Sequence, residues 1–240
     1  HLAGILMLPA AVGCGMHVLV TGATGFVGSN LVPALLDAGH DVRALVRDRT
    51  RYDAPEGVSV VEGDLLDAPS LDGAFADVDA AYYLVHSMGA DGDFEEKDRT
   101  AARNFERAAS AAGVSQVVYL GGLGGDEDAL SEHLRSRREV ETVLGRGDYD
   151  LTVFRAAIVV GAGSSSFEIV VALAKRLPLM ITPEWVRTPS QPIYIDDVVG
   201  YLVGAIETPD ARGRIFEIGG PEVLSYQAML ERTARLAGRR

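Results

Sequence analysis

Cysteine, lysine and positive charge are all scarce in this chain. The single cysteine, Cys14, excludes an internal disulfide framework and a cysteine-based metal site, and it fits a reducing cytoplasm. The five histidines show no ligand-type spacing, so we expect no metal. Only two of the 22 basic residues are lysine, and the net charge is −12. This acidic balance argues against nucleic acid and anionic membranes as general partners.

Charge is also missing from the first fifteen residues. This segment contains no Asp, Glu, Lys or Arg, is too short to span a bilayer and lacks the positive start of a signal peptide. We therefore expect residues 1–15 to be a non-native or disordered extension, with the natural chain beginning at Met16. We also expect a cytoplasmic location and no integral membrane segment.

From Met16 onward, short apolar runs alternate with helical segments. Strands are predicted at 17–21, 41–47, 58–64, 79–86, 115–121 and 150–160, and helices at 25–39, 69–75, 93–113 and 132–141. Continuous apolar strands alternating with helices indicate a parallel sheet covered on both faces. Right-handed crossovers then predict an α/β fold with a Rossmann-type doubly wound parallel sheet.

The segment "VTGATGFVGSN" places three glycines at G-x-x-G-x-x-G spacing between a strand and a helix. Gly22 permits the tight turn, Gly25 lets the backbone approach a pyrophosphate, and Gly28 lets the helix pack on the strand. The helix then presents free N–H groups to the phosphates. The strand–turn–helix context disfavours the alternative of a glycine-rich turn without a ligand.

This motif and the change in pattern after residue 160 predict the domain organisation. Residues 16–160 are predicted to form a dinucleotide-binding Rossmann core. Beyond it the elements become shorter and less regular. Residues 161–240 are therefore predicted to form a small irregular C-terminal cap on the substrate side, which completes the same domain.

The end of the second strand, "ALVRDRTR", bears on the choice between NAD and NADP. NAD binders place an acid there to hold the ribose 2′-hydroxyl, but Val46 occupies the expected position. Arg47, with Arg49 and Arg51 nearby, can pair with a 2′-phosphate, which favours NADP(H). NAD(H) stays possible, because a shift of one residue would make Asp48 the ribose acid.

Several longer segments carry a family resemblance. "TGATGFVG", "GDLLD", "IYIDDVVGYLVGAIE" and "RIFEIGGPEVLSYQAML" resemble the extended and atypical short-chain dehydrogenase/reductases over nearly the whole chain from Met16. "AYYLVHSMG", "HLRSRREVE" and "FRAAIVVGAGSSSFE" are similar to the atypical NAD(P)-binding group described as nucleoside-diphosphate-sugar epimerase-like. That group is also similar to a nucleotide-binding accessory subunit of respiratory complex I.

The catalytic residues that this resemblance implies are replaced here. The family uses a Tyr acid/base, a Lys four residues later and a Ser after the fifth strand. The matching positions hold His133, Arg137 and the glycines Gly121–Gly122. His133 could replace the tyrosine as proton donor, because the usual histidine pKa is roughly 6.5. Arg137 would then be a fixed cation on the ribose or the substrate.

Two other interpretations of this helix stay open. Helical spacing places Ser136 near the face of His133 and Arg137, but the face can also be an ordinary solvated surface. That interpretation predicts the surface ion pairs Arg135–Glu139 and Arg138–Glu141. The site can also bind nucleotide without turnover.

Further site residues are expected at the carboxyl ends of the strands, where ligands bind in this fold. His86 and Ser87 can polarise a carbonyl or simply cap loop backbone. The predicted cofactor contacts are Thr21, Gly22, Thr24, Gly25, Phe26, Val27, Gly28, Arg47, Asp64, Leu65, Val85, His86, Leu120 and Gly121. The predicted substrate contacts are Met88, Arg155, Trp185, Arg187 and Gln191. Arg155, in mid-strand, needs a partner, either a substrate anion or an acid such as Asp196.

The leading hypothesis is an NADP(H)-binding, atypical short-chain dehydrogenase/reductase-like oxidoreductase for a small carbonyl or quinone-type substrate. The alternative is a redox-inert nucleotide-binding regulator or assembly factor with a protein partner at the loop around Trp185, which the missing Tyr and Lys favour. A nucleoside-diphosphate-sugar epimerase or dehydratase is the third hypothesis. The missing tyrosine and the arginines near Arg47 count against it. The oligomeric state stays open.

Overall fold

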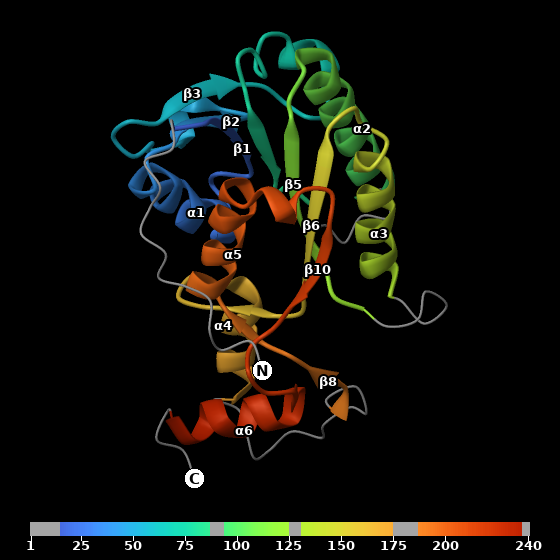
Figure 1. Cartoon of the computed structure of the whole chain (residues 1–240). Coiled ribbons are helices and arrows are strands. Elements are labelled where there is room, and N and C mark those ends of the chain that lie inside the picture. Colours follow the sequence, from blue (N-terminus) through green and yellow to red (C-terminus); the bar gives the residue numbers. More distant parts are fainter. Residues whose placement is uncertain (1–14, 87–93, 125–130, 175–186, 237–240) are drawn as a thin grey trace.

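A seven-stranded parallel sheet forms the centre of the structure (Figure 1). The computed structural model describes residues 15–86, 94–124, 131–174 and 187–236. The strands are β1 (His17–Thr21), β2 (Asp41–Val46), β3 (Ser59–Glu62), β4 (Ala80–Tyr83), β5 (Gln116–Gly122), β6 (Asp150–Ala156) and β10 (Ile215–Ile218). Their spatial order is β3-β2-β1-β4-β5-β6-β10. The chain reverses direction across the sheet between β3 and β4, so the predicted doubly wound Rossmann-type fold is confirmed.

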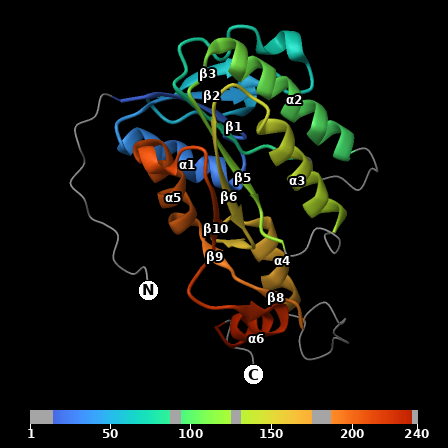
Figure 2. The same cartoon turned by 45° about the vertical axis from the view of Figure 1, so that its right-hand side comes forward.

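Two pairs of helices cover the two faces of this sheet (Figures 1 and 2). One face carries α1 (Phe26–Asp37) and α5 (Ile195–Glu207), and the other carries α2 (Phe94–Ala112) and α3 (Glu132–Leu144). Along β1, Val18 and Val20 pack in the core under α1 and α5, whereas Leu19 packs in the core under α2. Burial on both faces explains why the strands are continuous apolar runs.

The cap lies beyond the carboxyl ends of β5 and β6. It consists of α4 (Ser165–Ala174), α6 (Tyr226–Leu236), the strand pair β7 (Val159–Val160) with β9 (Ile193–Tyr194), and the pair β8 (Pro189–Ser190) with β11 (Leu224–Ser225). Helices α4 and α6 pack together, and Val170, Met229 and Leu230 form their small buried cluster. This cluster is separate from the two cores of the sheet.

The predicted boundary at residue 160 does not separate the core from the cap. The predicted strand 150–160 is two strands, because β6 ends at Ala156 and β7 pairs with β9 outside the main sheet. Conversely, α5 packs on α1 and β10 pairs with β6, so both belong to the Rossmann core. Their burial explains this: Val198 and Leu202 of α5 are completely covered.

The remaining differences are local. The predicted helix at 69–75 is a 3₁₀ turn at Ala68–Leu71. Two further 3₁₀ turns lie at Arg49–Arg51 and Pro209–Ala211. Residues 1–14 of the predicted extension 1–15 lie outside the described residues. No helix in the described part of the chain combines the length and the apolarity needed to cross a lipid bilayer.

Candidate functional site

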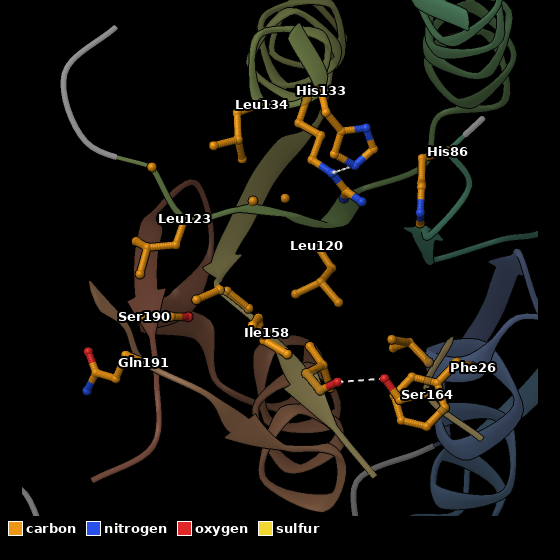
Figure 3. A pocket seen from close by; sticks show the side chains of 18 of the residues that line it. Phe26, His86, Leu120, Leu123, His133, Leu134, Ile158, Ser164, Ser190 and Gln191 are labelled. Atoms are coloured by element: carbon orange, nitrogen blue, oxygen red, sulfur yellow. Dashed lines mark hydrogen bonds between the residues drawn. The ribbon is translucent and has the colours of Figure 1, made fainter. Parts of the chain in front are cut away.

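A pocket of about 870 Å³ lies at the carboxyl ends of the strands, between α1, α3 and the cap (Figure 3). Its volume is typical of cofactor and small-molecule sites. The predicted residues that line it are Gly22, Gly25, Phe26, Val27, Gly28, His86, Leu120, Gly121, His133, Arg137 and Gln191. Lining residues that the sequence analysis missed include Leu123, Leu134, Ile158, Ser164, Ser190 and Tyr226. The only available signal for several of them was their place directly after a strand.

The glycine-rich loop has the tight backbone that its spacing predicts. Gly22 has a φ of +71°, and its carbonyl accepts a hydrogen bond from the N–H of Gly25 at 2.9 Å. A Cβ on Gly28 would lie 2.2 Å from this same carbonyl oxygen. A side chain at Gly28 therefore does not fit, and the main chain stays open to a ligand such as a pyrophosphate.

Helix α1 begins directly after this loop, and its first turn lines the pocket. Gly25 is the N-cap residue and provides no side-chain hydrogen bond. The first N–H groups of a helix have no intrahelical partner and carry the positive end of its dipole. Phe26, Val27 and Gly28 line the pocket at this point, so the loop and helix fit the diphosphate of a dinucleotide.

The residues after β2 differ in their availability to a ligand. Arg47 directly follows the strand and is exposed. Asp48 caps the 3₁₀ turn: one carboxylate oxygen accepts from the hydroxyl and N–H of Thr50 at 2.6 and 2.9 Å, and these bonds lower the pKa of Asp48. The guanidinium of Arg49 donates to the carbonyl of Val60. The carboxylate of Asp48 is therefore engaged within the turn, whereas the side chain of Arg47 is exposed.

Some residues that are predicted to contact the cofactor have structural roles. The buried Thr21 hydroxyl donates to the carbonyl of Tyr82 at 2.9 Å and accepts from the N–H of Leu84 at 3.2 Å, so it joins β1 to β4. This hydroxyl therefore has a structural role, and a cofactor contact of Thr21 stays a prediction. Leu65 is buried, and Val85 packs against the same core. Cofactor contacts of Thr24, Asp64, Leu65 and Val85 stay predictions.

The α3 helix places His133 and Arg137 on the pocket wall. The Nε of Arg137 donates to Nε2 of His133 at 3.3 Å. Because arginine has no acceptor, this nitrogen of His133 carries no proton, and the ring is neutral. The hydroxyl of Tyr119 donates to the carbonyl of Arg137 at 3.1 Å, which ties this turn of α3 to the sheet.

His86 approaches this pair from the end of β4 (Figure 3). Its ring lies edge-on to His133, with the centroids 6.1 Å apart. Burial lowers the pKa of His86 to about 4, and the nearby Arg137 and His133 add to this lowering. Part of the His86 side chain is exposed, so solvent reduces the shift in its pKa. Burial, then Arg137, also lower the pKa of His133. Both rings are therefore neutral at pH 7 and are poor proton donors.

Gly122 lies against two side chains of α3. A Cβ on this residue would lie 2.6 Å from Cδ2 of Leu134 and 3.1 Å from Cδ of Arg137. A side chain at Gly122 would therefore require these two α3 side chains to shift.

Ser136 faces away from the pocket, although helical spacing placed it near His133 and Arg137. It is buried, and its hydroxyl donates to Oδ2 of Asp98 on α2 at 3.0 Å. This bond joins α2 to α3 behind the pocket wall. Asp98 also acts on the site at a distance, because its charge opposes the lowering of the pKa of His133. Its role was not predicted from the sequence.

Arg155 lies outside the pocket-lining residues and has a structural partner. Its guanidinium makes two hydrogen bonds to the carboxylate of Glu141 on α3, at 2.6 and 3.2 Å, and approaches Glu217 at 4.0 Å. This geometry corrects both the predicted substrate contact and the predicted pairing with Asp196. The sequence could not reveal the partner, because only the packing of α3 on β6 brings Glu141 close.

The ion pairs along α3 are partly those predicted. Arg138 pairs with Glu141 at 3.5 Å, as predicted. The predicted Arg135–Glu139 pair does not form: Arg135 approaches Glu132 at 4.0 Å, and Glu139 binds Arg99 of α2.

The predicted cap residues have different outcomes. Gln191 lines the pocket, and its amide donates to the carbonyl of Gly220 at 2.6 Å. Arg187 is exposed and outside the pocket lining, so its substrate contact stays a prediction. Ser87, Met88 and Trp185 lie outside the described residues.

Known proteins with similar sequences support a nucleotide-binding role for this pocket. The family model described as NAD(P)H-binding matches residues 22–174. The chain is 30% identical over 231 residues to a (4-alkanoyl-5-oxo-2,5-dihydrofuran-3-yl)methyl phosphate reductase of Streptomyces griseus, covering 92% of this chain and 74% of the relative. It is 33% identical over 229 residues to a 3-diazoavenalumate denitrifying reductase of a Streptomyces species, covering 80% and 73%.

Two further similarities concern the complex I group and the fold. A mitochondrial NADH dehydrogenase [ubiquinone] 1 alpha subcomplex subunit 9 of Arabidopsis thaliana is 25% identical over 231 residues, covering 90% of this chain and 57% of the subunit. Among solved structures, the Bordetella bronchiseptica enzyme WbmG in complex with NAD has a TM-score of 0.77 at 20% identity, covering 95% of this chain and 80% of WbmG. The structural likeness supports the Rossmann fold.

Proposed function

We propose that this chain, which belongs to the NAD(P)H-binding family, is an NADP(H)-dependent reductase of a small carbonyl or quinone-type substrate. The observation that carries the proposal is the continuity of the pocket from the glycine-rich loop to Arg137 and the cap. A dinucleotide on the loop and a substrate under the cap would share this one cavity. Two relatives that cover most of this chain are named as reductases, which supports the same class of reaction.

The residues after β2 support NADP(H) over NAD(H). Arg47 is exposed at the end of the strand, where a 2′-phosphate lies in this fold. Asp48 is already engaged by two groups of Thr50. A guanidinium matches a phosphate in charge and geometry.

The bound cofactor would supply a hydride to the substrate. The chain would contribute orientation and positive charge. Arg137 is a permanent cation on the pocket wall and can stabilise negative charge that develops on a substrate oxygen. His133 accepts a hydrogen bond from Arg137, so it orients the guanidinium rather than donating a proton from Nε2. Water is then the proton source.

The second candidate is a redox-inert nucleotide-binding regulator or assembly factor. Its support is the replacement of the family's Tyr and Lys by His133 and Arg137, together with the similarity to a subunit of NADH dehydrogenase. A protein partner at the cap belongs to this alternative. An epimerase or dehydratase is less well supported, because that chemistry also needs the tyrosine.

Single-turnover oxidation separates the two candidates. The chain is loaded with NADPH, binding is confirmed by titration, and the sample is mixed with a panel of carbonyls, enones and quinones. We expect loss of the reduced-nicotinamide absorbance with at least one class of acceptor. Saturable NADPH binding with no oxidation across the panel would contradict the reductase and support the regulator.

A further inference from the structure

Arg137 is the arginine of α3 that faces the pocket, and it differs from its neighbours on the helix. Arg135 and Arg138 have glutamates within 4.0 and 3.5 Å, respectively. No carboxylate among the described residues lies within ion-pair distance of Arg137, and its Nε donates to neutral His133. In a chain of net charge −12, an arginine on a pocket wall with no acidic partner in the described part of the chain is a candidate anion site.

The composition of the pocket lining also supports an anion site at Arg137. The lining residues that the structure describes include no Asp or Glu, although the chain has 34 acidic residues. Among these described residues, no acid on the pocket wall neutralises the charge of Arg137. A ligand with a negative group would neutralise the charge of Arg137.

The anionic groups of a bound dinucleotide would lie elsewhere. In this fold the diphosphate sits at the glycine loop and the 2′-phosphate at the end of the second strand. Here these places are the first turn of α1, on one face of the sheet, and the region of Arg47. Arg137 belongs to α3 on the opposite face, beyond β5 (Figures 1 and 2). An anion at Arg137 would therefore come from the substrate.

Much of the pocket wall is apolar. Leu123, Leu134 and Ile158 line the same pocket in Figure 3, and Val223 and Tyr226 of the cap also line it. These residues come from the segments that follow β5 and β6, from α3 and from the cap. Such a surface binds an apolar body by removing it from water.

We propose that the substrate is an apolar molecule with an oxyanion group, a carboxylate or a phosphate, that pairs with Arg137. His133 is a positioning residue, because its Nε2 accepts from Nε of Arg137 and leaves the terminal nitrogens for the ligand. Gly122 leaves room for the stem of Arg137. The proposal rests on the proposed function for the position of the cofactor.

The test is calorimetric binding of three matched probes to the NADPH-loaded chain: phenylbutyrate, phenylbutyl phosphate and neutral phenylbutyramide. We expect at least one anionic probe to bind about ten- to a hundredfold more tightly than the amide, the range for a hydrogen bond to a charged group. Arg137→Met should remove this difference, and Arg137→Lys should keep part of it. The identity of the tighter anionic probe distinguishes carboxylate from phosphate.

Arg135→Met is the matched control, because Arg135 is an exposed arginine two residues away on the same helix. It should leave all three affinities unchanged. Equal affinity of the amide and both anions, no binding of any probe, or an unchanged difference in Arg137→Met would each overturn the proposal. Thermal melting of each variant establishes that it is folded.

An NADPH titration of the same samples separates this inference from the proposed function. Failure of the wild-type chain to bind NADPH would contradict the proposed function, while the probes on the unloaded chain would still test Arg137. A loss of NADPH affinity in Arg137→Met with unchanged probe discrimination would place Arg137 on the ribose and overturn the substrate contact.

Discussion

The glycine-rich end of the pocket is built from main chain, whereas the α3 end is built from side chains. At the first end, Gly22 and Gly28 are packed so closely that a Cβ on Gly28 would lie 2.2 Å from the carbonyl oxygen of Gly22. At the other end, His133, Arg137 and Leu134 occupy the wall, and Gly122 makes space for them. The first end fits the family's ordinary cofactor site, and the second replaces the family's ordinary catalysts.

This difference separates two kinds of function within one cavity. A main-chain site recognises phosphate, which every dinucleotide carries, and it depends on the absence of side chains. A side-chain site recognises the particular substrate and changes when residues change. Cofactor binding should therefore respond to added bulk at the loop, and substrate binding to charge on α3.

The largest effect is expected from Gly28→Ala. The added methyl group must displace the loop or helix, and strain of this kind costs up to about 3 kcal/mol of stability or NADPH affinity. Unfolding by urea and an NADPH titration measure the two contributions. Gly200→Ala is the control, because a Cβ there has nothing within 4 Å, and we expect it to be neutral or slightly stabilising. Unchanged binding and stability in Gly28→Ala would contradict the account of the loop.

Arg155→Met should lower the free energy of unfolding without changing ligand binding. The substitution leaves the half-buried Glu141 with Arg138 as its remaining arginine partner. We expect this loss to lower the free energy of unfolding by about 2 kcal/mol. Urea unfolding measures this loss. Weaker binding of the probes with unchanged stability would restore Arg155 as a substrate contact.

Arg47→Ala should weaken NADPH binding about tenfold, or about 1.4 kcal/mol, and leave NADH binding nearly unchanged. The lost interaction is the pairing of the guanidinium with the 2′-phosphate. Fluorescence titrations with both nucleotides give the ratio. An equal loss of affinity for NADH and NADPH would contradict the assignment of NADP(H) as the cofactor. Asp48→Asn should change neither affinity if its carboxylate only caps the turn.

The smallest effect is a pH dependence at His86. Its folded pKa of about 4 lies below its usual value of 6.5, so above pH 6.5 the neutral ring is present in both the folded and unfolded states. As the pH falls from about 6.5 toward 4, the unfolded chain takes up a proton that the folded chain does not, and stability is lost. His86→Gln should therefore lose less stability than the wild-type chain over this window. Parallel curves for the two proteins in pH-dependent urea unfolding would show that burial does not lower this pKa.

The sequence predicted the parts that depend on local pattern. The apolar runs and the glycine spacing gave the parallel sheet, the loop and the start of α1, because each follows from neighbouring residues. Position at or just after the carboxyl end of a strand also predicted that His86, Leu120 and Gly121 lie at the pocket. These features need no knowledge of distant contacts.

The rest depends on tertiary packing. Glu141 meets Arg155, and Ser136 meets Asp98, only because α3 lies against β6 and α2. The assignment of α5 and β10 to the cap failed for the same reason, since their short segments resemble cap elements until their pairing is known. The neutrality of His133 likewise follows from its contact with Arg137, which the i, i+4 spacing permits but does not require.

A structure of the chain with NADPH bound tests the central claim most directly. We predict the diphosphate on the first N–H groups of α1, the 2′-phosphate on Arg47, and the guanidinium of Arg137 turned toward the cavity and out of contact with the cofactor. A cofactor ribose hydrogen-bonded to Arg137, or a diphosphate away from the glycine loop, would contradict the division of the pocket into a cofactor end and a substrate end.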